Sequence, residues 1–441
     1  MITGELKNKL DALWNIFAAG GVVNPLDVIE QITYLMFIHD LDKTDTRRSK
    51  EAVMLGLPYQ SIFEGEFPVG LKSMPGEMLK WSKFKHQPAA TMFEIVQNGV
   101  FPFIKNLHAD KDSAYSKYMD DAIFKLPTPL LLSKVVDCLD DIYIQMEQIQ
   151  DSDIRGDMYE YLLSKISQSG RIGQFRTPRH IIRMMVELMR PTLDDIICDP
   201  AMGSAGFIMK AAKYIAEHQG DELLNIDNRS RYRSEIFHGS DSDASMMRIG
   251  CMNMMLHDVD EPQLHYRNSL SDENNDTNKY TLCLANPPFA GSLDANDIAH
   301  TLEAAVKTKK TELLFLALMM RMLQTGGRCA SVVPDTVLTG DAQAYKTIRS
   351  ALVDNHCLQA VITMQLHMVY FLFLQRNNAY CSDTILTACQ QQRHPVKNTD
   401  VCVPQCNIQQ PSFSLDKHIG EAADYRINLI GSNRLSILAD M

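Results

Sequence analysis

The chain has no uninterrupted apolar stretch that approaches the ~20 residues a membrane-spanning helix requires, so a membrane protein is excluded. Its first residues read Met-Ile-Thr-Gly-Glu-Leu-Lys and lack the basic and then apolar order of a secretory signal peptide. The sequence therefore predicts a cytoplasmic protein with no membrane contact.

Paired cysteines and a basic excess are also missing. The ten cysteines form no Cys-x-x-Cys pair, and several lie inside apolar strand-like runs. Small buried thiols in a reducing compartment are therefore a better interpretation than disulfides or zinc, and we expect no metal site. The formal net charge is −11. Any contact with nucleic acid must be local, or shared with a more basic partner.

What the chain does contain is enough apolar sequence for a large core. With 441 residues, 45% hydrophobic and 22% charged, it is expected to be globular, with two or three domains. The first part is mostly helical in pattern, and Asn24-Pro25 has the form of a helix start. Phe101-Pro102-Phe103 is interpreted as a turn between helices. The predicted helices are residues 3–18, 26–41, 89–99 and 129–141.

Further along, strand-like and helix-like runs alternate, as a parallel sheet with crossover helices demands. We therefore predict an open α/β sheet and place the domain boundary between residues 150 and 170. The predicted domains are a helical domain over 1–165, an α/β domain over 166–364 and an atypical tail over 365–441. The candidate strands are residues 195–199, 235–239, 263–267, 281–285, 328–333 and 358–364, and the helices are 205–217, 244–257, 311–324 and 342–354.

The first strand of this pattern runs into the segment Asp-Pro-Ala-Met-Gly-Ser-Ala-Gly-Phe, residues 199–207. Open α/β sheets bind ligands where a strand meets the next helix. The segment is neither G-x-G-x-x-G nor a phosphate loop, because no lysine follows the glycines. Asp199 at the strand end instead suits a ligand with a positively charged amine. Simple turn chemistry is the alternative.

Asp241 ends the second strand, the position where a ribose diol is usually bound in such folds. The alternative is an N-cap for the helix that follows. Together with the loop at Asp199, this position indicates an adenosine that carries no polyphosphate but has a cationic amino-acid arm. S-adenosylmethionine fits that description.

The most specific motif is Asn286-Pro287-Pro288-Phe289, which ends an apolar strand-like run. The two prolines remove two backbone donors and impose a stiff, extended turn. The Asn286 amide oxygen and the Pro287 carbonyl are then available as acceptors for the hydrogens of an exocyclic amine, while Phe289 stacks on a planar ring. The substrate indicated is an amino-bearing base.

Taken in order, these motifs resemble the modification subunit of type I restriction-modification systems. The resemblance covers roughly residues 1–364 and includes the helical N-terminal half around Asn24 to Tyr34. It implies a mainly parallel Rossmann-like methyltransferase sheet, preceded by an N-terminal α-helical domain. It also implies an adenine-specific DNA methyltransferase that uses S-adenosylmethionine. The implied partners are DNA, a specificity subunit, a second modification subunit and a restriction subunit.

The resemblance assigns roles to individual positions. It places the Asn286 to Phe289 tetrad at the flipped adenine, Asn268 near the adenine ring of the cofactor, and the segment Gln174 to Arg179 over the cofactor. Thr177-Pro178-Arg179 has a plain alternative as a helix start, and Asn268-Ser269 as a turn. Met202 and Ser204 depart from the family, which more often has a smaller residue and a threonine there. The implied cofactor-binding residues are Gln174, Phe175, Arg176, Thr177, Pro178, Arg179, Asp199, Pro200, Gly203, Ser204, Ala205, Gly206, Asp241 and Asn268.

The tail after Met364 departs most from the family, which continues with a Gly-containing turn and another core strand. Residues 365–410 hold eight glutamines, four cysteines and no glutamate. One interpretation is a partly aberrant or frame-shifted reading. The other is an unusual natural tail that completes the sheet, with Ile385-Leu386 in a strand.

Two other functions stay open at this stage. Methylation of a glutamine amide in a protein uses a related Asn-Pro-Pro tetrad that usually ends in tyrosine, so Phe289 and the helical N-terminal half favour DNA. The third possibility is a scaffold that binds the cofactor without turning it over.

Overall fold

The computed structural model describes residues 4–70, 72–107, 114–148, 158, 161–162, 165, 177–255, 257, 259–289, 291–364, 369–376 and 425–429. The chain divides into two compact units. The first comprises Met1–Arg179 and Asp243–Glu261, and the second His180–Ser242 and Pro262–Met441. No helix in the described ranges combines the length and apolar character needed to cross a bilayer. The cytoplasmic location stays a prediction.

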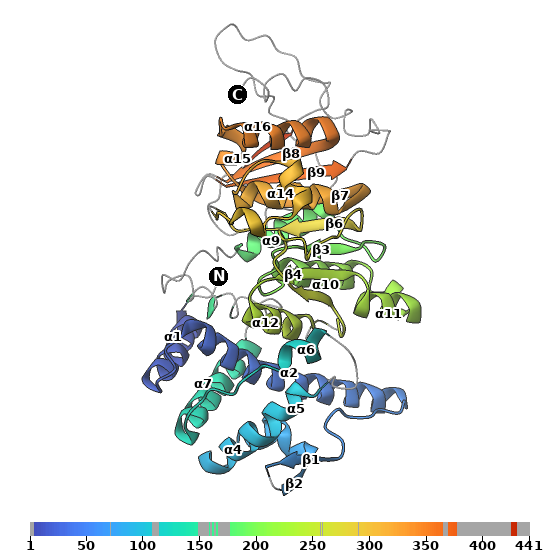
Figure 1. Cartoon of the computed structure of the whole chain (residues 1–441). Coiled ribbons are helices and arrows are strands. Elements are labelled where there is room, and N and C mark those ends of the chain that lie inside the picture. Colours follow the sequence, from blue (N-terminus) through green and yellow to red (C-terminus); the bar gives the residue numbers. More distant parts are fainter. Residues whose placement is uncertain are drawn as a thin grey trace. The chain divides into compact units, whose positions relative to one another are not determined.

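The first unit is helical apart from one hairpin (Figure 1). The predicted helix start at Asn24 is confirmed, because its side chain accepts from the Leu26 N–H at 3.2 Å and Pro25 opens the helix. The elements are α1 (Gly4–Ala19), α2 (Pro25–Leu55), β1 (Glu66–Val69), β2 (Lys72–Pro75), η1 (Gly76–Leu79), α3 (Trp81–Phe84), α4 (Ala89–Ile95), η2 (Val96–Val100), α5 (Phe101–Lys105), α6 (Ala114–Met119), α7 (Pro129–Glu147) and α12 (Ala244–Met255).

The predicted turn at Phe101-Pro102-Phe103 is wrong. The chain passes from α4 through the π-helical turn η2 directly into the helix α5. Pro102 falls in the first turn of α5, where a missing N–H breaks no hydrogen bond of that helix. Proline therefore continues the helical path here instead of ending it.

Helix α12 belongs to the first unit although it follows a strand of the second. Glu30 on α2 is buried and forms an ion pair with Arg248 on α12. A buried carboxylate needs such a partner to stay ionised. The sequence pattern predicts the helix but not the unit it joins.

The second unit is built on an eight-stranded sheet of order β10-β8-β9-β7-β6-β3-β4-β5. All six predicted strands are present, with ends shifted by a few residues, and the five from β7 to β5 are mutually parallel. The strands are β3 (Ile197–Asp199), β4 (Phe237–Asp241), β5 (Gln263–Tyr266), β6 (Tyr280–Ala285), β7 (Leu323–Pro334), β8 (His356–Met364), β9 (Val369–Arg376) and β10 (Tyr425–Leu429).

Strand β9 comes from the tail, at residues for which the sequence predicted no strand. It lies between β7 and β8 and pairs antiparallel with both. Its sequence, Val-Tyr-Phe-Leu-Phe-Leu-Gln-Arg, has the aromatic and apolar character of a strand. Residues 369–376 therefore extend the sheet beyond Met364. Ile385-Leu386 lies outside the described residues, and the origin of the tail stays a hypothesis.

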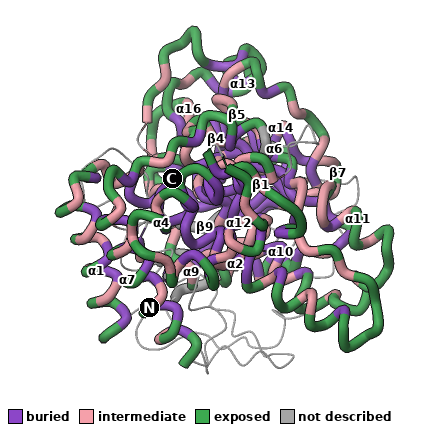
Figure 2. The backbone as a smooth tube through the Cα atoms, turned by 90° about the horizontal axis from the view of Figure 1, so that it is seen from below, coloured by how far each residue is buried: buried purple, intermediate pink, exposed green. Residues whose placement is uncertain are grey.

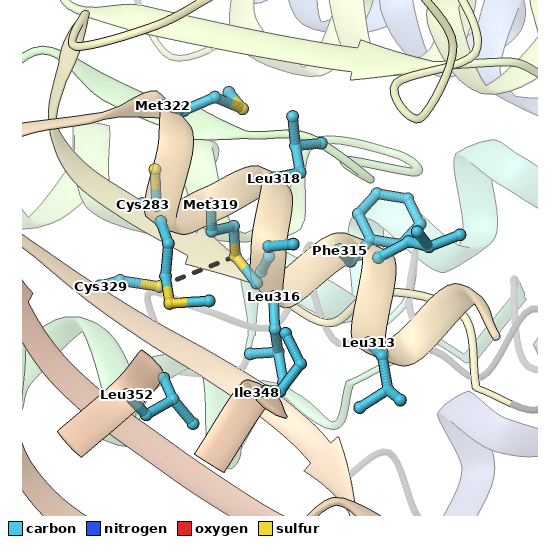
Figure 3. Packing of buried hydrophobic residues seen from close by; sticks show 14 of the residues in the cluster. Cys283, Leu313, Phe315, Leu316, Leu318, Met319, Met322, Cys329, Ile348 and Leu352 are labelled. Carbon is cyan, nitrogen blue, oxygen red and sulfur yellow. Dashed lines mark hydrogen bonds between the residues drawn. The ribbon is translucent and has the colours of Figure 1, made fainter. Parts of the chain in front are cut away.

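Helices cover both faces of the sheet, on opposite sides at its centre. Cys198, Cys283 and Cys329 are register partners on β3, β6 and β7, and they belong to the core cluster formed with α14. Figure 3 shows Cys283 and Cys329 within this cluster. Gly239 follows His238, the register partner of Cys198, so it faces the other way, toward α10. The helices of this unit are α9 (Arg179–Met189), α10 (Gly206–His218), α11 (Ile226–Ser234), α13 (His300–Ala305), α14 (Thr311–Met322), α15 (Thr336–Thr339) and α16 (Gln343–Ser350), with short η3 (Glu222–Leu224), η4 (Ala295–Asp297) and η5 (Ala351–Asn355).

Burial follows this layering. Figure 2 shows the tube purple through the middle of the strands and mostly green along α11. Helix α14 is buried on nearly all sides, with residues from Thr311 to Met322 in the core. The predicted buried thiols Cys198, Cys283 and Cys329 are confirmed, since each is at most 1% exposed. A rigid sheet centre thus supports the strand ends where polar residues gather.

Candidate functional site

The order in which strands are added to the sheet reverses between β3 and β6. Strand β4 pairs with one side of β3 and leads on to β5, whereas β6 pairs with the other side and leads on to β7. All five strands are parallel, so their carboxyl ends meet at one edge. In open α/β sheets, ligands bind outside the carboxyl ends at such a switch point. Asp199 and Asn286 follow the two strands that flank it.

Asp199 is the last residue of β3 and is only 1% exposed. Its carboxylate accepts the Ala201 N–H at 3.0 Å, and it forms no ion pair in the part of the chain that the structure describes. Burial raises the pKa of the Asp199 carboxyl to about 8, and the charge of Asp241 adds to this rise. A buried acid of this kind gains most from a cationic ligand.

The loop after Asp199 is shaped by two left-handed residues. Gly203 has φ +51°, and Ala205, directly before α10, has φ +65°. The Ala205 N–H donates to the Met202 carbonyl at 2.8 Å, which closes the turn. A Cβ on Gly203 would meet no atom within 4 Å, so conformation and not crowding favours glycine there. Ser204 is buried in this loop.

Asp241 binds this loop and does not cap a helix. The Gly203 N–H donates to the Asp241 carboxylate at 2.9 Å. The cap of α12 is Asp243, whose carboxylate accepts from Ser245 N–H at 2.8 Å and Met246 N–H at 3.1 Å. The N-cap alternative for Asp241 is therefore wrong. Its carboxylate lies at the strand end, against the glycine loop.

The turn after β5 closes the same edge. Asn268 accepts the Leu270 N–H at 3.0 Å, so the predicted turn at Asn268-Ser269 is present. The Ser269 hydroxyl donates to the Pro200 carbonyl at 2.6 Å and thereby joins this turn to the Asp199 loop. Asn268 as a cofactor contact stays a prediction. Ser269 was not predicted as a site residue, because nothing in its sequence neighbourhood signals a partner 69 positions away.

The tetrad leaves the sheet from β6, on the other side of the switch point. Asn286 and Phe289 are half-buried, Pro287 is buried and Pro288 is exposed. The Thr311 hydroxyl at the start of α14 donates to the Pro288 carbonyl at 3.0 Å. Thr311 is a second residue that sequence reasoning missed, since it reads only as the first residue of an apolar helix.

The segment predicted to cover the cofactor is described only in part. Gln174, Phe175 and Arg176 lie outside the described residues. Thr177 and Pro178 precede α9, which begins at Arg179, so the helix-start alternative is present. The residues that the structure links by hydrogen bonds at one strand edge are Asp199 to Gly203, Asp241 and the turn at Asn268.

Comparison with protein families gives two matches. Residues 150–403 match the family described as N-6 DNA methylase. Residues 6–139 match the family described as the HsdM N-terminal domain. The two matches divide the chain at nearly the place where the sequence pattern changes from helical to alternating.

Several curated relatives are methylase subunits of type I restriction enzymes. The chain is 28% identical over 280 residues to the type I restriction enzyme EcoEI methylase subunit from Escherichia coli, covering 62% of this chain and 56% of that protein. It is 25% identical over 346 residues to the StySPI methylase subunit from Salmonella potsdam, covering 76% and 64%. The chain thus spans less than two thirds of the length of these relatives.

Solved structures resemble the fold. A modification subunit assigned to a type I restriction enzyme from Vibrio vulnificus superposes with a TM-score of 0.65 at 23% identity, covering 84% of this chain and 81% of that one. A type I restriction-modification methyltransferase subunit from Streptococcus thermophilus gives a TM-score of 0.58 at 17% identity, covering 85% of each chain. At these identities the likeness establishes the mainly parallel α/β fold.

Proposed function

Because the chain belongs to the N-6 DNA methylase family, we propose that it transfers a methyl group from S-adenosylmethionine to the exocyclic amine of adenine in DNA. One observation carries the proposal: Asp199, a buried acid with no cationic partner in the described ranges, and an acceptor tetrad, Asn286 to Phe289, follow the two strands that flank the switch point. The first suits a cationic cofactor and the second an amine.

The strand-end residues fit S-adenosylmethionine. The Asp199 carboxylate would hold the cationic amino-acid arm, and the carboxylate of Asp241 would accept from the ribose diol. Gly203 to Gly206 would line the cofactor with backbone and small side chains, and no phosphate-binding lysine is needed. The covering role of Gln174 to Arg179 and the contact of Asn268 are part of this proposal.

Catalysis in this proposal is positioning. The bound cofactor supplies an electrophilic methyl group on sulfur. The Asn286 amide oxygen and the Pro287 carbonyl accept the two amine hydrogens, which turns the nitrogen lone pair out of ring conjugation and toward the methyl carbon. The N–C bond forms as the C–S bond breaks, and the amine nitrogen then loses one proton to water. Phe289 stacks on the base, a contact worth about 1–3 kcal/mol.

We further propose that the chain acts as a modification subunit with a separate specificity subunit, a second modification subunit and a restriction subunit. The relatives are named as methylase subunits of type I restriction enzymes, and residues 6–139 match the HsdM N-terminal domain. A net charge of −11 suits a chain that relies on a more basic partner to find its DNA site. The predicted domains 1–165, 166–364 and 365–441 remain part of the proposal, with β9 of the tail completing the sheet of the second domain.

The test is a transfer assay with labelled S-adenosylmethionine and DNA, with and without a cognate specificity subunit. Label on adenine only with the subunit present is the expected result. Label on protein would move the assignment to glutamine methylation, and cofactor binding without transfer would leave a scaffold.

Asn286→Ala identifies the site. We expect transfer to fall by about 10³-fold or more, because an acceptor of the reacting amine is lost, while cofactor affinity stays unchanged. Asn225→Ala, which removes only the cap of α11, is the matched control. Transfer that survives Asn286→Ala would exclude the tetrad as the reaction site.

A further inference from the structure

The tetrad needs an anchor that its own sequence cannot supply. Two consecutive prolines have no N–H groups, so this stretch can be fixed to the protein only through its carbonyls. If Asn286 and the Pro287 carbonyl are to receive the amine, the Pro288 carbonyl is the group left for the protein to hold. Its partner in the structure is the Thr311 hydroxyl, at 3.0 Å.

The Thr311 hydroxyl binds the backbone both before and after Phe289. It donates to the Pro288 carbonyl and accepts the Gly291 N–H at 3.1 Å. The Thr311 N–H in turn donates to the Gly291 carbonyl at 3.1 Å. Thr311 is 6% exposed, so little water competes for these bonds. One buried side chain therefore closes the loop that presents Phe289.

The approach is close enough to restrict the sequence on the loop side. A Cβ on Gly291 would lie 2.7 Å from the Thr311 hydroxyl oxygen and 2.8 Å from its Cγ2. Glycine at 291 is thus required for the backbone to reach Thr311. The next residues continue the contact, because Leu293 N–H donates to the Lys309 carbonyl at 3.1 Å.

Thr311 itself is held in place from α16. Its neighbours in sequence both contact Tyr345: Lys310 Nζ donates to the tyrosine oxygen at 2.8 Å, and the tyrosine O–H donates to Glu312 Oε1 at 3.1 Å. Tyr345 is buried at 4% exposure. The Glu312 contact is buried and the Lys310 contact is partly buried, so a shift of the first turn of α14 would break a buried hydrogen bond to Tyr345.

We propose that Thr311 is a positioning residue for methyl transfer: its hydroxyl fixes the Pro288 carbonyl, and thereby the orientation of the Pro287 carbonyl and Phe289 toward the base. The inference rests on the proposed function of the tetrad. It predicts that loss of this hydroxyl impairs the transfer step and leaves cofactor binding unaffected.

The test compares Thr311→Val with Thr281→Val in the full chain. The Thr281 hydroxyl likewise accepts one backbone N–H, that of Ile196 at 2.8 Å, and donates to one oxygen, Asp195 Oδ1 at 2.7 Å. It lies at the other end of β6. The two variants therefore lose the same kind of group, one near the amino end of β6 and one against the loop that follows its carboxyl end, and Thr311→Ser restores the hydroxyl in place.

Single-turnover transfer with the specificity subunit should fall about 10²-fold in Thr311→Val, because small misplacements of reacting groups cost that much. It should stay within about threefold of the wild type in Thr311→Ser and Thr281→Val. Cofactor affinity, measured by calorimetry, should be unchanged in all three. An equal loss of rate in Thr281→Val would mean that Thr311 acts only through stability, and would overturn the proposal.

A second measurement does not depend on activity. Hydrogen exchange of peptides spanning residues 286–293 should accelerate about tenfold or more in Thr311→Val, because a hydrogen bond that held the loop is gone, and should not change in Thr281→Val. Slow exchange retained in Thr311→Val would refute the anchor. If the two variants show this difference in exchange but the wild type does not methylate adenine, the proposed function is refuted and the anchor is not.

Discussion

At the two ends of β3, a buried aspartate lies in opposite electrostatic surroundings. Asp195, just before β3, is 4% exposed and receives two hydrogen bonds from Arg328, at 2.9 and 2.8 Å, and one from Thr281 at 2.7 Å. These partners hold the pKa of the Asp195 carboxyl below its usual range despite the opposing effect of burial. Asp199, at the other end of β3, is equally buried but pairs with no cation among the described residues, and its pKa is raised to about 8.

This difference distinguishes an aspartate that stabilises the fold from one that is suited to bind a ligand. At the amino edge the protein supplies its own counter-charge, so the network is complete and adds to stability. At the carboxyl edge an acid is buried at a cost, and the missing cation is the one that a cofactor would bring. Perturbed acids that lack a partner gather at functional sites for this reason.

The largest expected effect is at the amino edge. Arg328→Met would leave Asp195 buried without compensation, and we expect the free energy of unfolding at pH 7 to fall by about 3–5 kcal/mol. The deficit should persist to about pH 4 and shrink only toward about pH 2, because the wild-type pair is stabilising above the unfolded pKa of Asp195 and this contribution is lost as pH falls through the lowered folded pKa. Urea unfolding at these pH values measures it. A loss below about 1 kcal/mol would mean that the ion pair between Arg328 and Asp195 contributes little to stability.

The second effect is at the carboxyl edge and concerns the ligand. Asp199→Asn should weaken S-adenosylmethionine binding by about 10²-fold, because a charge-assisted contact is lost. Calorimetric titration provides the number. Asp194→Asn, which changes an acid that is 98% exposed on the same segment, is the control and should bind normally. Equal affinity in the two variants would remove Asp199 from the site.

The same substitution should change stability in the opposite sense to that of Arg328→Met. Since the folded pKa of Asp199 is raised, the folded state holds a proton that the unfolded state has lost between about pH 4 and pH 8, and wild-type stability falls across this range. Asp199→Asn removes that cost, so we expect a gain of about 2 kcal/mol at pH 8 and almost none at pH 4. A gain that does not depend on pH would contradict the assignment of a raised pKa.

The smallest effect tests the loop itself. Gly203→Ala forces a side chain into φ +51° and should cost about 1 kcal/mol of stability, with a further weakening of cofactor binding. Gly21→Ala in the first unit, at φ +86° and equally free of crowding, should cost a similar amount and leave binding unchanged. Melting temperatures and cofactor titrations of the pair distinguish strain from function.

The parallel half of the sheet was predictable from sequence for a physical reason. Buried parallel strands read as apolar runs with turns and helices between them, and β3, β6 and β7 follow that rule, whereas β5 is only partly buried. Strand β9 was missed because its apolar run lies in a segment of unusual composition. Helix α5 was missed because proline normally signals an end, and here it occupies a first turn.

Only those site residues that form local sequence motifs could be predicted. The motifs at Asp199, Asp241 and Asn286 are local patterns at strand ends, so sequence alone located them. Ser269, Thr311 and Arg328 act through partners 69, 23 and 133 positions away, and no local pattern records such contacts. The residues that hold the edge together are therefore the ones a sequence cannot reveal without a fold.

The insertion of β9 between β7 and β8 has a consequence for biogenesis. As the nascent chain leaves the ribosome, every strand from β3 to β8 emerges before the one that must separate β7 from β8. Until it arrives, β7 presents an open edge, the kind of surface on which unwanted pairing and aggregation begin. Translation that stalls shortly after Met364 would therefore be expected to yield a product that needs a chaperone, even though each strand that flanks the switch point has already been synthesised.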